Sequence, residues 1–149
     1  MAEPAVGSTI EHATPFDAAL VGQIVRHGLR EFPNECCGLI AARAERPVEV
    51  FAMRNADASP ASYRLDPKEQ LDVTQRIEDE GLELWGIYHS HTHSEAYPSD
   101  TDRRQAGWVQ PFYPDVRYLL LSLRDREHPV LRAFRIADGD VTEEELIVS

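Results

Sequence analysis

The chain lacks the features that mark a membrane, secreted or nucleic-acid-binding protein. Its 149 residues contain no apolar run near the roughly 18 residues that a membrane-spanning helix needs. The first residues have neither a basic start nor an apolar stretch of signal-peptide length. With 26 acidic side chains against 15 basic ones, the formal net charge of −11 repels phosphate backbones and anionic lipids. We therefore expect a cytoplasmic protein that binds neither nucleic acid nor membrane.

Cysteine is scarce as well, because the chain has two such residues and they are adjacent, Cys36 and Cys37. Adjacent cysteines are poorly placed for a structural disulfide, and two are too few for a four-cysteine zinc site. A reducing compartment fits both facts. A cysteine nucleophile with a histidine base is conceivable, but two small buried hydrophobes are the more ordinary role for this pair.

Length and composition suit one globular domain, since 42% of the residues are hydrophobic. We expect a flexible N-terminus over residues 1–13 and one domain over residues 14–149. Apolar periodicity predicts helices near 15–32, 67–80 and 99–109, and strands near 36–42, 48–54, 82–91, 116–123, 130–136 and 141–148. This mixture predicts an α/β or α+β domain in which helices pack against a mixed sheet.

Capping patterns define where the three helices are expected to begin. Thr14 is read as the N-cap of the first helix, and Asp66 as that of the second, because proline follows each of them and an acid stands three residues on. Ser99 followed by Asp102 repeats the same logic for the third helix. On its own, this last pattern implies a helix cap and no chemistry.

The strand predicted near 82–91 ends in His89-Ser90-His91. Side chains alternate along a strand, so Trp85, Ile87, His89 and His91 are expected to share one face. Two histidines on one face can bind one ion, although such a pair more often serves as hydrogen-bonding side chains. Asp102, in the first turn of the next helix, would supply a third ligand. A catalytic zinc site has three protein ligands and an open fourth position.

The full pattern is His-Ser-His, seven residues, Ser, two residues and Asp, with a glutamate upstream in Pro33-Asn34-Glu35-Cys36-Cys37-Gly38-Leu39. This pattern resembles the JAMM motif of the MPN-domain (JAB1/MPN/Mov34) metallopeptidases. The resemblance implies an MPN-like fold with one Zn²⁺ held by His89, His91 and Asp102. It also implies that Glu35 is the general acid/base and that Ser99 donates a hydrogen bond to the developing oxyanion.

Three loop regions, at 55–67, 92–98 and 136–143, are similar to a subfamily of the Mec type, the CysO-cysteine peptidases. These act in cysteine biosynthesis on a ubiquitin-like sulfur carrier. The resemblance implies a partner of the CysO, ThiS or MoaD kind, cut after its C-terminal Gly-Gly to release cysteine or a short extension. We expect Asn55, Tyr63 and His93 to contact the substrate. Thr92 departs from many bacterial relatives, which have proline there.

Two other functions stay open at this point. The enzyme could process or deconjugate a different ubiquitin-like or thio-metabolite carrier, which the motif would not distinguish. Alternatively, the chain could be a non-catalytic MPN scaffold, which would be expected to lack some of the ligands that are present here. The fold family also allows a homodimer.

Overall fold

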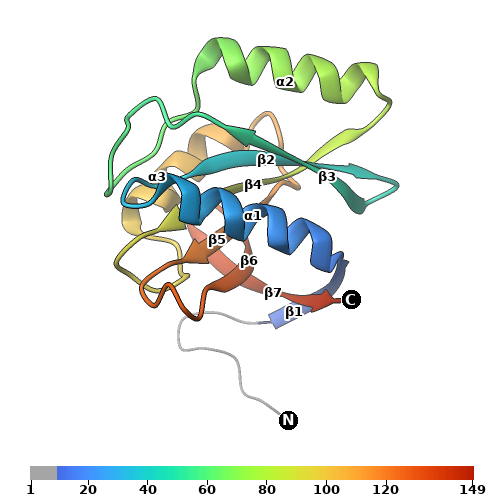
Figure 1. Ribbon diagram of the computed structural model, residues 1–149. Helices are drawn as coiled ribbons and strands as arrows, with labels where there is room; N and C mark the ends of the chain where they lie inside the picture. The colour runs from blue at the N-terminus through green and yellow to red at the C-terminus, as the bar shows by residue number, and fades with distance from the viewer. Residues whose placement is uncertain (1–9) are drawn as a thin grey trace.

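Seven strands and three helices follow one another along residues 10–149, the part of the chain that the computed structural model describes (Figure 1). The helices are α1 (Ala18–Glu31), α2 (Pro67–Asp79) and α3 (Asp100–Val109). The strands are β1 (Ile10–Phe16), β2 (Cys37–Arg43), β3 (Arg46–Met53), β4 (Glu83–His91), β5 (Arg117–Ser122), β6 (Val130–Ala137) and β7 (Asp140–Val148). They form one mixed sheet in the order β1-β7-β6-β5-β4-β2-β3, which confirms the predicted α+β domain.

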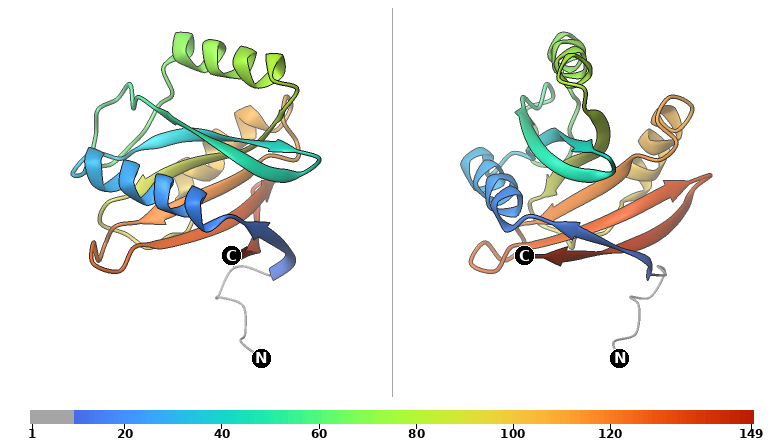
Figure 2. Two further views of the ribbon diagram at one scale, coloured as in Figure 1. Left: turned by 45° about the vertical axis from the view of Figure 1, so that its right-hand side comes forward. Right: turned by 90° about the vertical axis from the view of Figure 1, so that its right-hand side faces the viewer.

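Helices cover both faces of this sheet, with α1 on one side and α2 and α3 on the other (Figure 2). On the first face, Leu20 and Ile24 of α1 pack against a cluster that includes Tyr88 and Leu121. On the second face, the apolar cluster includes Ile77 of α2, Ala106 of α3 and Ile87 of β4. Because β4 is covered on both faces, its last seven side chains are buried.

The neighbours of β4 determine what lies near its end. It pairs with β5 in parallel, with His91 opposite Ser122, and with β2 in antiparallel, with Cys37 opposite His89. Parallel strands end at the same edge of a sheet. The end of β4 therefore lies beside the end of β5 and the beginning of β2, toward the left in Figure 1.

The predicted start of the first helix is wrong. Thr14 and Pro15 belong to β1, which pairs in parallel with β7, and Asp17 is the N-cap of α1, its side chain accepting a hydrogen bond from Ala19 N at 2.8 Å. Residues 10–13, assigned above to a flexible N-terminus, are thus part of the sheet. Residues 1–9 of that segment lie outside the described residues.

A β-bulge corrects the predicted faces of β4. The register with β2 shifts between Ile40, which lies opposite Gly86, and Ala41, which lies opposite Leu84. Trp85 is the extra residue, and it packs in the cluster beneath α1 with Tyr88 rather than on the face of Ile87. After the bulge the alternation is regular, so the prediction that His89 and His91 share a face still holds.

The other elements follow the sequence expectations closely. Asp66 caps α2 by accepting from Glu69 N, and Gly81 ends that helix region with a φ of 71°. The β6–β7 hairpin turns at Asp138 and Gly139, both with positive φ. Outside the seven strands, an isolated bridge pairs Asn55 with Leu65. Among the described helices, none is long and apolar enough to cross a bilayer.

Candidate metal centre and catalytic cleft

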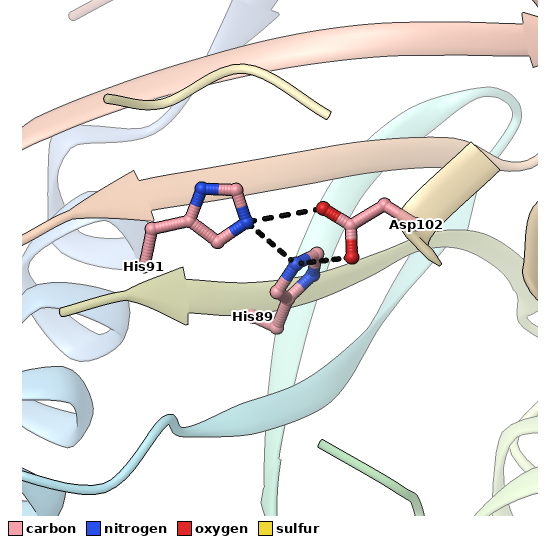
Figure 3. A group of neighbouring side chains, drawn as sticks. All are labelled: His89, His91 and Asp102. Atoms are coloured by element: carbon pink, nitrogen blue, oxygen red, sulfur yellow. Dashed lines mark hydrogen bonds and ion pairs between the residues drawn. The ribbon is translucent and has the colours of Figure 1, made fainter. Parts of the chain in front are cut away.

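Three ligand atoms meet where β4 ends and α3 begins (Figure 3). His89 Nε2 lies 3.2 Å from His91 Nε2 and 3.1 Å from Asp102 Oδ1. His91 Nε2 lies 3.0 Å from Asp102 Oδ2. The two histidines come from one strand face and the aspartate from the first turn of the helix that follows, as the sequence predicted. The structure thus brings the three predicted ligands together.

These distances suit a tetrahedral ion. Zinc bonds of about 2.0–2.1 Å to nitrogen and oxygen imply ligand-to-ligand edges of roughly 3.3–3.4 Å, close to the 3.2 Å between the two imidazole nitrogens. The chemistry of the donors agrees, because Nδ1 of His91 is 2.8 Å from the carbonyl of Glu95, to which it donates. A neutral His91 then presents a lone pair at Nε2, facing a carboxylate oxygen and another imidazole. The donor set of the trio therefore fits a cation such as Zn²⁺.

Asp102 and the two histidines shift one another's pKa values. Burial alone would raise the pKa of Asp102, but hydrogen bonds from His89 and His91 hold it well below its usual range. Burial alone would lower the pKa of His91, and Asp102 raises it above the usual value. His89 is fully enclosed, and burial lowers its pKa despite Asp102. A deprotonated carboxylate beside a neutral His89 is the state that a metal ion requires.

Asp102 also belongs to a capping box at the start of α3. Ser99 Oγ accepts from Asp102 N at 3.0 Å, and Asp102 Oδ2 accepts from Ser99 N at 3.0 Å. The capping and metal-binding interpretations of this pattern are therefore compatible, since one carboxylate meets both demands. Because Ser99 Oγ accepts in the cap, its hydroxyl hydrogen remains available for another acceptor.

Glu35 lies across a cleft of about 340 Å³ that His91, Ser99 and Asp102 also line. Its main chain is fixed on both sides, because its N–H donates to Ser59 O at 2.9 Å and its carbonyl accepts from Asn55 Nδ2 at 3.1 Å. Burial, reinforced by Asp102 and opposed by His91, raises the pKa of Glu35 to about 7. A carboxyl group with this pKa can exchange a proton near neutral pH.

Ser90 and Thr92, for which no role was predicted, connect the end of β4 to the segments around the cleft. Ser90, between the two histidines, faces the other way, and its Oγ accepts from Cys36 N at 2.8 Å, next to Glu35. Thr92 Oγ donates to Pro60 O at 2.9 Å, which ties the end of β4 to the loop on the far side of the cleft. A proline at position 92 would have no hydroxyl to make this bond.

The three predicted substrate contacts have different surroundings. Tyr63 stacks on His89, with ring centroids 4.3 Å apart and planes 21° apart. Asn55 uses its amide to organise its own loop, donating to Ser62 O and accepting from Arg64 N. His93 is exposed at the rim of the cleft and is not among the three converging ligands. Direct contact of these residues with substrate stays a prediction.

Cys36 and Cys37 are both buried and free. Burial raises the pKa of Cys36 to about 11 and that of Cys37 to about 12, so neither thiol ionises readily near neutral pH. The sulfur of Cys37 contacts the carbonyl of Arg54 at 3.6 Å. These surroundings favour the small-hydrophobe role over the nucleophile.

An apolar groove of about 570 Å³ adjoins the cleft. Tyr63 and Gln105 line both, so the two spaces are neighbours. The groove runs between the Tyr63–Leu65 segment, β4 and α3, and its wall includes Trp108 and Phe112, which are 73% and 78% exposed. Large apolar side chains exposed together indicate a binding surface.

Comparisons with known proteins were made against this geometry. A model of the family described as prokaryotic homologs of the JAB domain matches residues 17–137. The chain is 46% identical over 129 residues to the CysO-cysteine peptidase of Mycobacterium tuberculosis, with 85% of each chain covered. It is 37% identical over 93 residues to the desampylase of Haloferax volcanii, covering 60% of this chain and 63% of that protein. The solution structure of protein DSY2949 from Desulfitobacterium hafniense has a TM-score of 0.80 and 31% identity, covering 91% of this chain and 92% of that one.

Proposed function

This chain belongs to the family of prokaryotic homologs of the JAB domain, and on that premise we propose that it is a zinc-dependent peptidase acting on a ubiquitin-like sulfur carrier. It cuts the bond after the C-terminal Gly-Gly of the carrier and releases cysteine or a short C-terminal extension. The similarity to a CysO-cysteine peptidase along most of both chains supports this choice of substrate.

One observation carries the proposal: His91 and Asp102 of the converging ligand trio line the same cleft as Glu35. A scaffold that only binds partners has no use for this combination. Complete ligands next to a buried acid with a pKa near 7 are the parts of a hydrolytic centre.

Each residue then has a defined task. His89, His91 and Asp102 would hold a zinc ion, which would supply an acidified water and polarise the scissile carbonyl. Glu35 accepts a proton from the attacking water and returns it to the leaving nitrogen. Ser99 donates its hydroxyl hydrogen to the carbonyl oxygen as negative charge develops there. Tyr63 keeps His89 in place by stacking on its ring.

The apolar groove suits the carrier side of the substrate. It shares Tyr63 and Gln105 with the cleft, so a substrate segment that lies beside α3 in the groove would lead toward the candidate metal centre. Main-chain contacts would then hold the Gly-Gly end near Glu35, while apolar side chains further back fill the groove.

A second candidate function is deconjugation, in which the bond joins the carrier to a lysine of another protein. The similarity to a desampylase favours this alternative over part of the chain. Deconjugation would use the same catalytic residues, but the leaving group would be the lysine of another protein.

The test is cleavage of a CysO-type carrier extended by a C-terminal cysteine, followed by mass spectrometry of the intact carrier. The zinc-loaded protein should remove one cysteine residue. Glu35→Gln should bind zinc and lose about 10²–10⁴-fold in turnover, the usual contribution of a general base. His89→Ala should lose both zinc and activity.

Elemental analysis of each variant provides the control, because it separates loss of the ion from loss of the base. An intact carrier after incubation with zinc-loaded wild-type protein would refute the proposed substrate. Full turnover by Glu35→Gln would refute the role of Glu35.

A further inference from the structure

Strand β4 sets a linear order for the surfaces around the metal centre. Leu84 and Ile87 border the groove, His89 and His91 are the ligands, and His93 lies just beyond the strand at the cleft rim. At about 3.3 Å per residue, Ile87 and His93 are up to roughly 20 Å apart along the chain. The groove and the rim therefore lie on opposite sides of the ligands. If the carrier occupies the groove, the leaving group of the cleavage must depart past the rim.

The rim is built on one aromatic ring. Phe32, just after α1, lies edge-on to His93 with centroids 6.3 Å apart. The guanidinium of Arg126 lies over the same ring, with Cζ 4.4 Å from its centroid. Phe32 thus places a cation near His93, whose imidazole lines the cleft.

Arg126 differs from the three other arginines that lie over aromatic rings in the described residues, because each of those also forms an ion pair. It is exposed, and within the described residues it forms no ion pair, although its neighbour Asp125 pairs with His128 at 3.0 Å. Stacking on Phe32 orders the guanidinium and leaves its N–H groups free to bind an anion.

The loop that carries Arg126 is fastened to the metal centre. Leu123 N donates to His91 O at 2.9 Å, and Ser122 Oγ donates to Ser94 O at 2.6 Å. These bonds follow from the parallel pairing of β4 with β5, which brings the segments after both strands together. The rim therefore has a fixed position relative to the ligands.

We propose that Arg126 and His93 form a carboxylate-recognition rim that selects substrates whose leaving group is a single amino acid with a free α-carboxylate. This inference rests on the proposed function. In such a leaving group the carboxylate is two bonds from the nitrogen that departs, and the rim is the cationic surface on that side of the ligands. Arg126 binds the carboxylate, and the imidazole of His93 donates a second hydrogen bond. The leaving nitrogen of a lysine side chain has no such carboxylate, so the rim favours removal of a terminal residue over deconjugation.

The experiment compares two carriers made by semisynthesis, one ending in Gly-Gly-Cys with a free carboxylate and one ending in Gly-Gly-Cys carboxamide. Zinc-loaded wild-type protein should cleave the carboxylate form with a kcat/KM about fivefold higher, the upper range for an exposed ion pair. The preference should shrink at high salt because the charges are screened.

Variants assign the preference to the rim. Arg126→Gln should lower the ratio of the two kcat/KM values toward one, Arg126→Lys should keep most of it, and His93→Ala should lower it in part. Arg124→Gln is the matched control, because Arg124 is exposed on the same loop and outside the rim. Urea midpoints of the Arg126 and Arg124 variants should equal that of the wild type.

Each outcome decides the question. Equal cleavage of both carriers by the wild type overturns the rim proposal and leaves the proposed peptidase activity in place. A preference that persists unchanged in Arg126→Gln also overturns it. Failure to cleave either carrier overturns the proposed function and this inference together.

Discussion

Among single residues, His27 and Tyr88 form a buried polar pair beneath α1, with His27 Nδ1 2.7 Å from Tyr88 Oη. Burial and Arg30 lower the pKa of His27, against the opposing charges of Glu31 and Glu69. The unfolded chain, with an ordinary histidine pKa of about 6.5, binds a proton first as the pH falls. This pair therefore stabilises the fold fully above about pH 6.5 and progressively less as the pH falls below it.

His27→Gln tests this dependence. At pH 7 the variant should be less stable by about 1 kcal/mol, the net value of one hydrogen bond. The difference from wild type should shrink between pH 7 and pH 5, because glutamine has no proton to bind. Urea unfolding at both pH values measures it, at one fixed zinc concentration. A difference that is constant with pH would mean that His27 does not titrate on unfolding.

The sequence revealed those site residues that lie close together along the chain, where a local pattern can predict their contact. His89, His91 and Asp102 lie within fourteen residues, so strand alternation and a helix cap were enough to predict their convergence. The stacking of Tyr63 on His89 joins segments 26 positions apart, and no local pattern encodes the angle between the rings. Ser90 was missed for the same reason, since its partner Cys36 lies 54 positions away, just before β2.

At the scale of elements, α3 shows how a helix start can take part in chemistry. Its capping box places Ser99 and Asp102 in one hydrogen-bonded unit, and Asp102 also faces the two histidines. Loss of the Ser99 hydroxyl should thus affect stability through the cap and turnover through the missing donor. These effects can be separated, because glycine is a better N-cap than alanine.

Ser99→Ala should lower the free energy of unfolding by about 1 kcal/mol and Ser99→Gly by only a few tenths. Both should lose about a hundredfold in kcat, the typical cost of removing one oxyanion donor. Ser99→Thr keeps the hydroxyl and serves as the control. Chemical denaturation and steady-state cleavage measure the two effects. If Ser99→Gly turned over normally, Ser99 would be a helix cap and nothing more.

Helices and strands were predicted well where the sequence pattern that defines them lies within the element. They were predicted poorly where pairing with a distant strand defines them. The hairpin of β6 and β7 and the cap of α2 have short-range turn and cap signals, and both were found. Thr14 was taken for a helix cap because β1 is defined by pairing with β7, more than 125 residues away. The bulge at Trp85 depends on the register with β2 and has no signal within β4.

For the whole molecule, a buried carboxylate joins four strands at the edge distant from the cleft. Glu144 of β7 accepts from Arg117 Nε of β5 at 3.2 Å and from Thr14 Oγ of β1 at 3.3 Å. Arg135 Nε of β6 lies 3.0 Å from its other oxygen, close enough for an ion pair but without the alignment of a hydrogen bond. This network holds β1 and β7 against the centre of the sheet.

Glu144→Gln should destabilise the protein by about 2 kcal/mol. This is less than the roughly 3–5 kcal/mol for breaking a fully buried pair, because both arginines reach solvent in part. Glu145→Gln, on the exposed side of the same strand, should change stability little. Urea unfolding compares the two variants, and the cleavage rate should be unchanged in both. Equal stability of both variants would show that the network contributes nothing.

The order of the seven strands was beyond prediction. Sequence patterns placed most strands along the chain, but the parallel pairing of β4 with β5 and of β1 with β7 depends on contacts across the sheet. That pairing brings the segments after β4 and β5 together. Local patterns could therefore predict neither the strand order nor the position of the rim.

Helix α3 spans the distance between the candidate metal centre and the apolar groove. Asp102 in its first turn faces the two histidines, and Trp108 near its end lines the groove. A shift of this one element would move residues of both places at once, so under the proposed function α3 offers a route by which the ion and the carrier could be coupled. Any cooperativity between them must be reciprocal. If an ion at the candidate metal centre raises the affinity for a carrier in the groove, the carrier raises the affinity for the ion by the same factor.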